Sequence, residues 1–342
     1  MVKPPKAHTK RTGPAKPAAR KKVRPEPLRA NARTPAGWRM LVLLNRKSGT
    51  MRTLGPEAVA KQVRQALAPV CERLDIELVD GAMPAELAAK IDAGIYDCVV
   101  VGGGDGSISS MAGRLAGGDV TLGALPLGTM NMIVRVLGFP QDLAPALAAL
   151  ATAEVRRIDL GEVNGETFVR QVSFGLQPRI ARLREKFGYS SRLTKLISGL
   201  RAMVAVLVSP RNLHLTARNA GGETPLRSPA VIISNNEILG GEKLLVQDAL
   251  DNGVLGLYAL PPPGVIAIVR LTFAVLKGRW REDQGLTAQT ATSIMLLPGR
   301  FWFRKPKQIL CSLDGELRRL RFPVSAKIRP KSLNVLMPKA AP

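Results

Sequence analysis

Val99-Val100-Val101-Gly102-Gly103-Gly104-Asp105-Gly106-Ser107 joins an apolar run to a glycine-rich turn and to a helix predicted over 107–115. Glycines let the backbone approach a ligand closely, and a helix N-terminus offers unpaired N–H groups and a positive dipole end. The stretch therefore predicts a buried strand, a phosphate-binding loop and a helix. The alternative is an ordinary strand–helix turn capped by Asp105 or Ser107. The loop matches neither a Walker A sequence nor the dinucleotide fingerprint.

A second glycine turn follows the next predicted strand, in Leu125-Pro126-Leu127-Gly128-Thr129-Met130-Asn131. It repeats the order of strand end, glycine, hydroxyl and helix start. Two such turns at neighbouring strand ends would form one crevice at the carboxyl edge of a parallel sheet, where ligands bind in open α/β folds. Each turn alone is ordinary; together they favour a phosphate site, with Asp105 placed to order Mg²⁺ or a substrate hydroxyl.

Two weaker motifs add polar groups. Asn45-Arg46-Lys47-Ser48-Gly49 follows the first predicted strand and either faces the same crevice or is a solvated basic turn. Leu313-Asp314-Gly315-Glu316 has two carboxylates around a glycine. It is either a hairpin turn or a pair of acids that face the cleft and take a proton from an attacking hydroxyl.

The pattern around these motifs predicts the fold class, an α/β N-terminal domain followed by a β-rich, sandwich-like C-terminal domain. We expect the α/β domain over 38–155, with 326–340 as a candidate segment to complete it, and the β-rich domain over 156–325. The first part alternates apolar strands with helices, at 40–44, 56–74, 76–79, 84–93, 98–101, 107–115, 122–125, 131–137 and 143–151. The second has short strand-like segments at 157–163, 167–174, 213–218, 229–234, 254–260, 291–296, 308–313 and 332–337, interrupted by amphipathic helices near 191–208 and 264–278.

The charge is uneven. The chain of 342 residues has a formal net charge of +24, and residues 1–39 hold twelve Lys or Arg and one acid, Glu26. We expect residues 1–37 to be a disordered basic tail that solubilises the chain or binds acidic phospholipids, with nucleic acid as a further polyanion. Three unpatterned cysteines and two isolated histidines argue against a disulfide framework or a His-based site. With no apolar stretch long enough to cross a bilayer, a cytoplasmic protein at the inner membrane surface is expected.

The four motifs occur in the order and spacing of the diacylglycerol kinase catalytic family, which includes bacterial diacylglycerol kinases and sphingosine kinases. The resemblance covers roughly residues 38–340. It implies an ATP-dependent lipid kinase that transfers the γ-phosphoryl group to a diacylglycerol-like or sphingoid hydroxyl, with ATP and Mg²⁺ as cofactors. It assigns the catalytic role to Glu316, Asp314 and Asp105. ATP binding falls to Asn45, Arg46, Lys47, Ser48, Gly49, Gly103, Gly104, Asp105, Gly106, Ser107, Ile108, Ser109, Gly128, Thr129 and Asn131.

The sequence departs from the family pattern at several positions. Ser109 and Ser110 replace a usual Asn-Glu pair, Met132 replaces an Asp, and Asn252 replaces an Asp that helps hold a structural Mg²⁺ in bacterial members. Asn252 is therefore a weak metal candidate. Two other functions stay open: a soluble-substrate kinase similar to NAD kinases, and a membrane- or anion-binding protein with a weakened kinase site.

Overall fold

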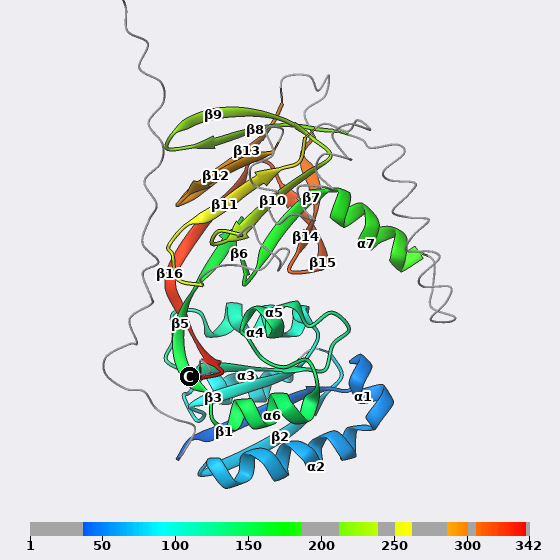
Figure 1. Cartoon of the computed structure of the whole chain (residues 1–342), viewed down its shortest axis with the longest axis vertical. Coiled ribbons are helices and arrows are strands. Elements are labelled where there is room, and N and C mark those ends of the chain that lie inside the picture. The colour runs from blue at the N-terminus through cyan, green and yellow to red at the C-terminus, as the bar shows by residue number, and fades with distance from the viewer. Residues whose placement is uncertain are drawn as a thin grey trace, which may run out of the picture. The chain divides into compact units, whose positions relative to one another are not determined.

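Four parallel strands form one end of the larger sheet, in the computed structural model (Figure 1). The structure describes residues 37–81, 83–186, 212–238, 250–261, 286–299 and 306–339. The strands are β1 (Arg39–Asn45), β2 (Arg73–Val79), β3 (Cys98–Gly103) and β4 (Thr121–Pro126), in the order β2-β1-β3-β4. Every residue of β3 and β4 is buried, as expected for central strands that are covered on both faces. The four strands predicted for the first part of the chain are therefore confirmed.

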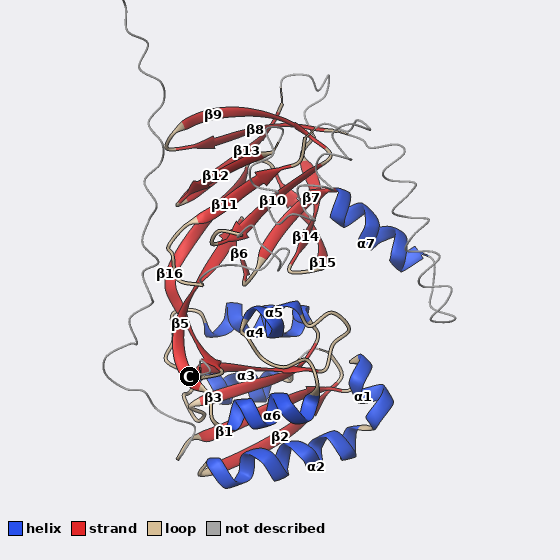
Figure 2. Ribbon diagram, in the orientation of Figure 1, coloured by secondary structure: helices blue, strands red, loops and turns tan. Residues whose placement is uncertain are grey.

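Short helices connect and cover these strands (Figure 2). They are α1 (Gly49–Leu54), α2 (Pro56–Leu67), the 3-10 turn η1 (Ala68–Val70), α3 (Ala85–Asp92), α4 (Asp105–Leu115), α5 (Met132–Val136) and α6 (Leu143–Ala151). Helix α4 packs on β3 and β4, whereas α2 packs on β2 and on α6. The helix predicted over 56–74 is too long: it ends at Leu67, and β2 begins at Arg73. Pro69 within η1 marks the break.

The rest of the described chain is mainly antiparallel. Its strands are β5 (Glu154–Val163), β6 (Glu166–Phe168), β7 (Gln171–Gly175), β8 (Leu213–Asn219), β9 (Gly222–Ser228), β10 (Ala230–Asn235), β11 (Leu255–Ala259), β12 (Thr287–Ala291), β13 (Ser293–Pro298), β14 (Gln308–Leu313), β15 (Glu316–Arg321) and β16 (Val324–Met337). The helix α7 (Leu176–Lys186) follows β7. One sheet has the order β12-β11-β10-β7-β14-β15. The mixed α/β and antiparallel β fold class is as predicted.

The long strand β16 joins the parallel strands to antiparallel ones in a single sheet. Val335 pairs with Leu122 of β4 in parallel, while earlier residues pair antiparallel with β13, and β5 runs along its length (Figure 1). Residues 33–342 consequently form one compact unit by their contacts. The division at residue 155 stays a prediction.

Three strands were not predicted from the sequence, and each of them lies at the edge of a sheet. They are β9, β12 and β15, with the sequences GETPLRS, TAQTA and ELRRLR. Edge strands carry polar and charged residues because one side faces water, so they lack an apolar signal. The segment 167–174 also contains two strands, β6 and β7, where one was predicted, and α1 and α7 were not predicted. Residues 1–36 of the basic tail and the helices predicted at 191–208 and 264–278 lie outside the described residues.

Asp159 fixes the junction between β5, β16 and the loop before β11. Its side chain is fully buried, and its two oxygens accept the backbone N–H groups of Lys331 and Gly253, both at 2.7 Å. Asn235 Nδ2 donates to the Asp159 carbonyl at 2.7 Å. Asn252, the weak metal candidate of the sequence, is exposed beside Gly253. The loop is therefore held by the hydrogen bond from the Gly253 N–H to the carboxylate and by the one that the Asp159 N–H donates to the Leu250 carbonyl.

Replacing Asp159 with alanine should destabilise the protein by about 2 kcal/mol, because two partly buried backbone N–H groups lose a charged acceptor. Urea denaturation followed by circular dichroism measures the change, with the exposed Asp80→Ala as a matched control. Equal midpoints for the two variants would contradict this role of Asp159.

Candidate functional site

Three turns meet at the carboxyl edge of β1, β3 and β4, as the sequence predicts for a parallel sheet. Asn45 Nδ2 approaches Ser107 Oγ at 3.4 Å, which links the first turn to α4. The Thr50 N–H donates to the Leu127 carbonyl at 3.2 Å, which links the first turn to the last. A Cβ on Gly128 would lie 2.7 Å from Gly104 Cα, so the two glycine turns touch backbone to backbone. The motifs are thus brought together into one site.

The chemistry at this edge suits a polar ligand. Gly104 caps α4, and a Cβ built on it would meet nothing within 4 Å, so its surface is open. The first N–H groups of a helix have no intrahelical acceptor. Ser48 Oγ and Asn131 Oδ1 are buried without a hydrogen-bond partner. Buried polar atoms without an internal partner are rare, and water or a ligand can satisfy them. Exposed side chains of Arg46 and Lys47 add positive charge.

Asp105 has a structural contact that the sequence did not reveal. Its Oδ1 accepts the Ile133 N–H at 2.7 Å, so it caps the first turn of α5 and ties the two glycine turns together. One carboxylate oxygen is therefore occupied within the protein. In the part of the chain that the structure describes, no group of three or more His, Cys, Asp or Glu could hold a metal.

Two residues predicted for ATP binding face inward. Ile108 is fully buried and belongs to the hydrophobic core. Ser109 is buried, and its Oγ donates to Asp314 Oδ2 at 2.6 Å. The side chain of Ile108 is committed to packing and that of Ser109 to Asp314; the ATP-binding role expected of the two residues stays a prediction. Ile108 belongs to the core between α4 and the parallel strands, whereas Ser109 faces the β14–β15 turn that carries Asp314.

Asp314 and Gly315 form the two-residue turn between β14 and β15, and both have positive φ, +46° and +100°. This is the hairpin that an Asp-Gly pair favours. The Asp314 carboxylate is buried and accepts, besides Ser109, the backbone N–H groups of Val169, Arg170 and Gln171 at 2.7–2.9 Å. Burial raises the pKa of Asp314, and these hydrogen bonds oppose that rise. Both oxygens of Asp314 are therefore occupied within the protein, and the catalytic role expected of it stays a prediction.

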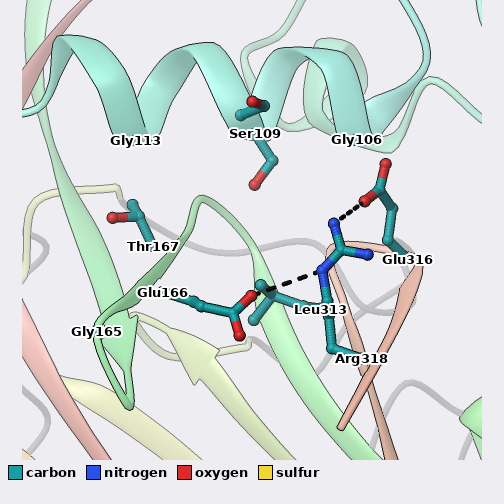
Figure 3. Close-up of a pocket in the computed structure, with 10 residues that line it drawn as sticks. Gly106, Ser109, Gly113, Gly165, Glu166, Thr167, Leu313, Glu316 and Arg318 are labelled. Atoms are coloured by element: carbon teal, nitrogen blue, oxygen red, sulfur yellow. Dashed lines mark hydrogen bonds and ion pairs between the residues drawn. The ribbon is translucent and has the colours of Figure 1, made fainter. Parts of the chain in front are cut away.

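Glu316, unlike Asp314, has a side chain that is accessible to solvent. Its carboxylate is about half exposed and lies against Gly106, where a built Cβ would come within 1.6 Å of Glu316 Oε1. Its other oxygen, Oε2, accepts a hydrogen bond from Arg318 Nη2 at 2.6 Å (Figure 3). The acid is therefore held beside the first turn of α4, at the glycine loop.

Two cavities open beside α4. One of about 330 Å³ is lined by Glu316 and Gly106 together with Ser109, Ser110, Gly113, Gly165, Glu166, Thr167, Leu313 and Arg318 (Figure 3). The other, of about 270 Å³, has mainly apolar walls and the polar groups of Asn45, Ser107 and Arg114. Ser110 lines both, so they lie on two sides of one residue.

The profile of the diacylglycerol kinase catalytic domain matches residues 39–163, which hold both glycine turns. A Pseudomonas syringae protein named "Probable lipid kinase YegS-like" is 30% identical over 308 residues, covering 84% of this chain and 92% of that one. The chain belongs to the diacylglycerol kinase catalytic family. A Bacillus subtilis diacylglycerol kinase is 25% identical over 229 residues, covering 65% of this chain and 71% of that protein.

Solved structures of other proteins share the fold of this chain. A crystal structure of a diacylglycerol kinase from Bacillus anthracis superposes with a TM-score of 0.62 at 17% identity, covering 87% of this chain and 96% of that one. A second structure from the same organism gives 0.68 at 18%, covering 91% and 98%. The described residues include no helix that is both long and apolar enough to cross a membrane.

Sequence reasoning missed three charged residues near the site. Glu166 and Arg318 line the larger cavity, and Arg170 is buried close to two acids. Burial lowers the pKa of Arg170, and the negative charges of Asp314 and Asp105 oppose that effect. Of the three, only Arg318 could have been found from the sequence, because a residue two positions after Glu316 in a strand lies on the same face of that strand.

Replacing Gly104 with alanine should leave the melting temperature unchanged but weaken ATP binding by about tenfold or more, because the added methyl group has room only while no phosphate is present. Calorimetric titration with ATP measures the affinity. Gly118→Ala, at an exposed glycine just beyond the opposite end of α4, is the control. Unchanged affinity in Gly104→Ala would show that no phosphate approaches this loop.

Proposed function

We propose that the protein transfers the γ-phosphoryl group of ATP to the hydroxyl group of a lipid. The carrying observation is the position of Glu316, a half-exposed carboxylate held against Gly106 of the glycine loop. A general base must lie within hydrogen-bonding reach of the hydroxyl that loses its proton. Membership of a lipid kinase family supports the same reaction, and relatives named lipid kinases match the chain over most of its length.

The two cavities would bind different substrates, one the nucleotide and the other the lipid acceptor. The glycine turns, with Ser48 and Asn131, bind the phosphates, and the mainly apolar cavity beside Asn45 and Ser107 receives the nucleotide base. The acceptor hydroxyl enters the cavity at Glu316, on the other side of Ser110. Glu316 takes the proton of the hydroxyl, while Asp314 holds the turn that carries it. Mg²⁺ arriving with the nucleotide would neutralise phosphate charge, with Asp105 as the nearby carboxylate.

To reach a lipid acceptor, the protein must also bind at a membrane surface. The basic tail, residues 1–37, is the proposed contact with acidic phospholipids, since positive segments are attracted to anionic membranes. This contact adds no chemistry to the transfer step, so catalysis is tested separately.

The test is transfer of labelled phosphate from ATP to a panel of lipids in mixed micelles, including diacylglycerol, phosphatidylglycerol and sphingosine. Glu316→Gln should lower turnover about 10²- to 10⁴-fold, because the base is lost. Glu223→Gln is a matched control, since Glu223 is a half-exposed strand residue that pairs with Arg218 outside the site. If the wild type transfers phosphate to a lipid and both variants do so at the same rate, Glu316 is not the base.

ATP binding without transfer to any lipid would favour the anion-binding protein, and transfer only to a soluble acceptor would favour the soluble-substrate kinase. Either outcome would overturn the proposed function.

Replacing Gly106 with alanine should also lower turnover strongly while the protein remains folded. The new methyl group would overlap Glu316 Oε1, and this flexible carboxylate can swing away at little cost in stability. Alanine within a helix is itself stabilising by roughly 0.5–1 kcal/mol over glycine. Thermal unfolding and the same transfer assay measure the two effects. A fully active Gly106→Ala would contradict the placement of the base.

A further inference from the structure

Glu316 does not stand alone in the larger cavity. Arg318 lies between it and Glu166: Arg318 Nη2 donates to Glu316 Oε2 at 2.6 Å, and Arg318 Nε is 3.6 Å from Glu166 Oε2 (Figure 3). The two acids come from different strands, β15 and β6. One cation thus connects the candidate base to a second carboxylate across the cavity.

The strand itself aims Arg318 into the cavity. Successive side chains of a β-strand point to opposite faces, so Glu316, Arg318 and Leu320 share one face of β15. Leu320 is only 2% exposed and belongs to the hydrophobic core, which fixes that face as the inner one. Arg319 and Arg321 lie on the other face and are exposed. The three arginines of this strand therefore have different surroundings despite their identical chemistry.

Stability does not account for the arrangement. The side chains of Glu316, Arg318 and Glu166 are 43–47% exposed. Ion pairs this exposed contribute roughly 0–1 kcal/mol. A base that works in catalysis, by contrast, is commonly oriented by a third group that holds it in one geometry. Glu316 Oε2 is occupied by Arg318, which directs Oε1 toward Gly106.

We propose that Arg318, held in place by Glu166, is a positioning residue that orients Glu316 for proton transfer. The inference rests on the proposed function. Glu316 Oε1 takes the proton as the acceptor oxygen bonds to the γ-phosphorus. The bond from that phosphorus to the β–γ bridging oxygen breaks, and ADP leaves with the electron pair. Arg318 touches neither substrate; it fixes the oxygen that does not receive the proton.

Arg318→Ala should lower kcat about tenfold to a hundredfold with little change in the KM for ATP, because a misplaced catalytic group slows the chemical step. Arg318→Lys should recover part of the activity, and guanidinium ions added to Arg318→Ala should recover part as well. Arg319→Ala, on the outer face of the same strand, is the matched control and should behave like the wild type. Glu166→Gln should lower kcat less than Arg318→Ala, since it acts one step further away.

A double-mutant cycle separates positioning from a merely structural role. If Arg318 acts through Glu316, adding Arg318→Ala to Glu316→Gln should cost nothing further. Independent effects that multiply would overturn the proposal. So would an Arg318→Ala variant that loses ATP affinity and kcat equally.

Arginine side-chain NMR tests the contacts without any turnover. The Nε–H signal of Arg318 should shift in both Glu166→Gln and Glu316→Gln but not in Glu223→Gln. A wild type that phosphorylates no lipid would overturn the proposed function, while unmoved Nε–H signals would overturn the positioning role whatever the activity.

Discussion

The buried carboxylate of Asp314 is the contact on which the arrangement of the site depends. It accepts hydrogen bonds from Ser109 of α4 and from three successive backbone amides that lead into β7. Buried polar groups are costly unless they are paired, so four donors on one carboxylate define a single low-energy arrangement. Helix α4, which starts at the glycine loop, is thereby fixed to the β14–β15 turn. That turn carries Glu316, so the acid and the glycine loop have a defined separation.

This contact also explains why two acids separated by one glycine behave so differently. The positive φ of Asp314 and Gly315 makes a tight turn in which the Asp314 side chain is buried. Glu316 begins the next strand, and its side chain lines the cavity. Burial and hydrogen bonding commit Asp314 to structure, while half exposure leaves Glu316 accessible. The motif is thus the hairpin turn that its sequence suggested, with one acid buried in the turn and the other half exposed in the cavity.

The glycine turns are linked by a similar use of polar groups. Asp105 caps α5 through the Ile133 N–H, and Asn45 approaches Ser107, so each turn is fastened to its neighbour before any ligand binds. The orphaned oxygens of Ser48 and Asn131 remain as the buried polar atoms of these turns without an internal partner.

The sequence by itself determined the parallel strands, the helix after the glycine loop and the meeting of the two glycine turns at one sheet edge; it left open whether the turn at Asn45 joins them. These follow from local rules: apolar runs bury strands, glycines end them, and parallel strands share a carboxyl edge. It did not reveal the polar edge strands β9, β12 and β15, because an edge strand needs no apolar pattern. Only the tertiary structure decided which acid of the Asp-Gly-Glu motif is buried, that Ser109 serves Asp314, and that Arg318 and Glu166 flank Glu316. Those contacts join residues far apart in the chain, and their burial depends on strand pairing that no local pattern encodes.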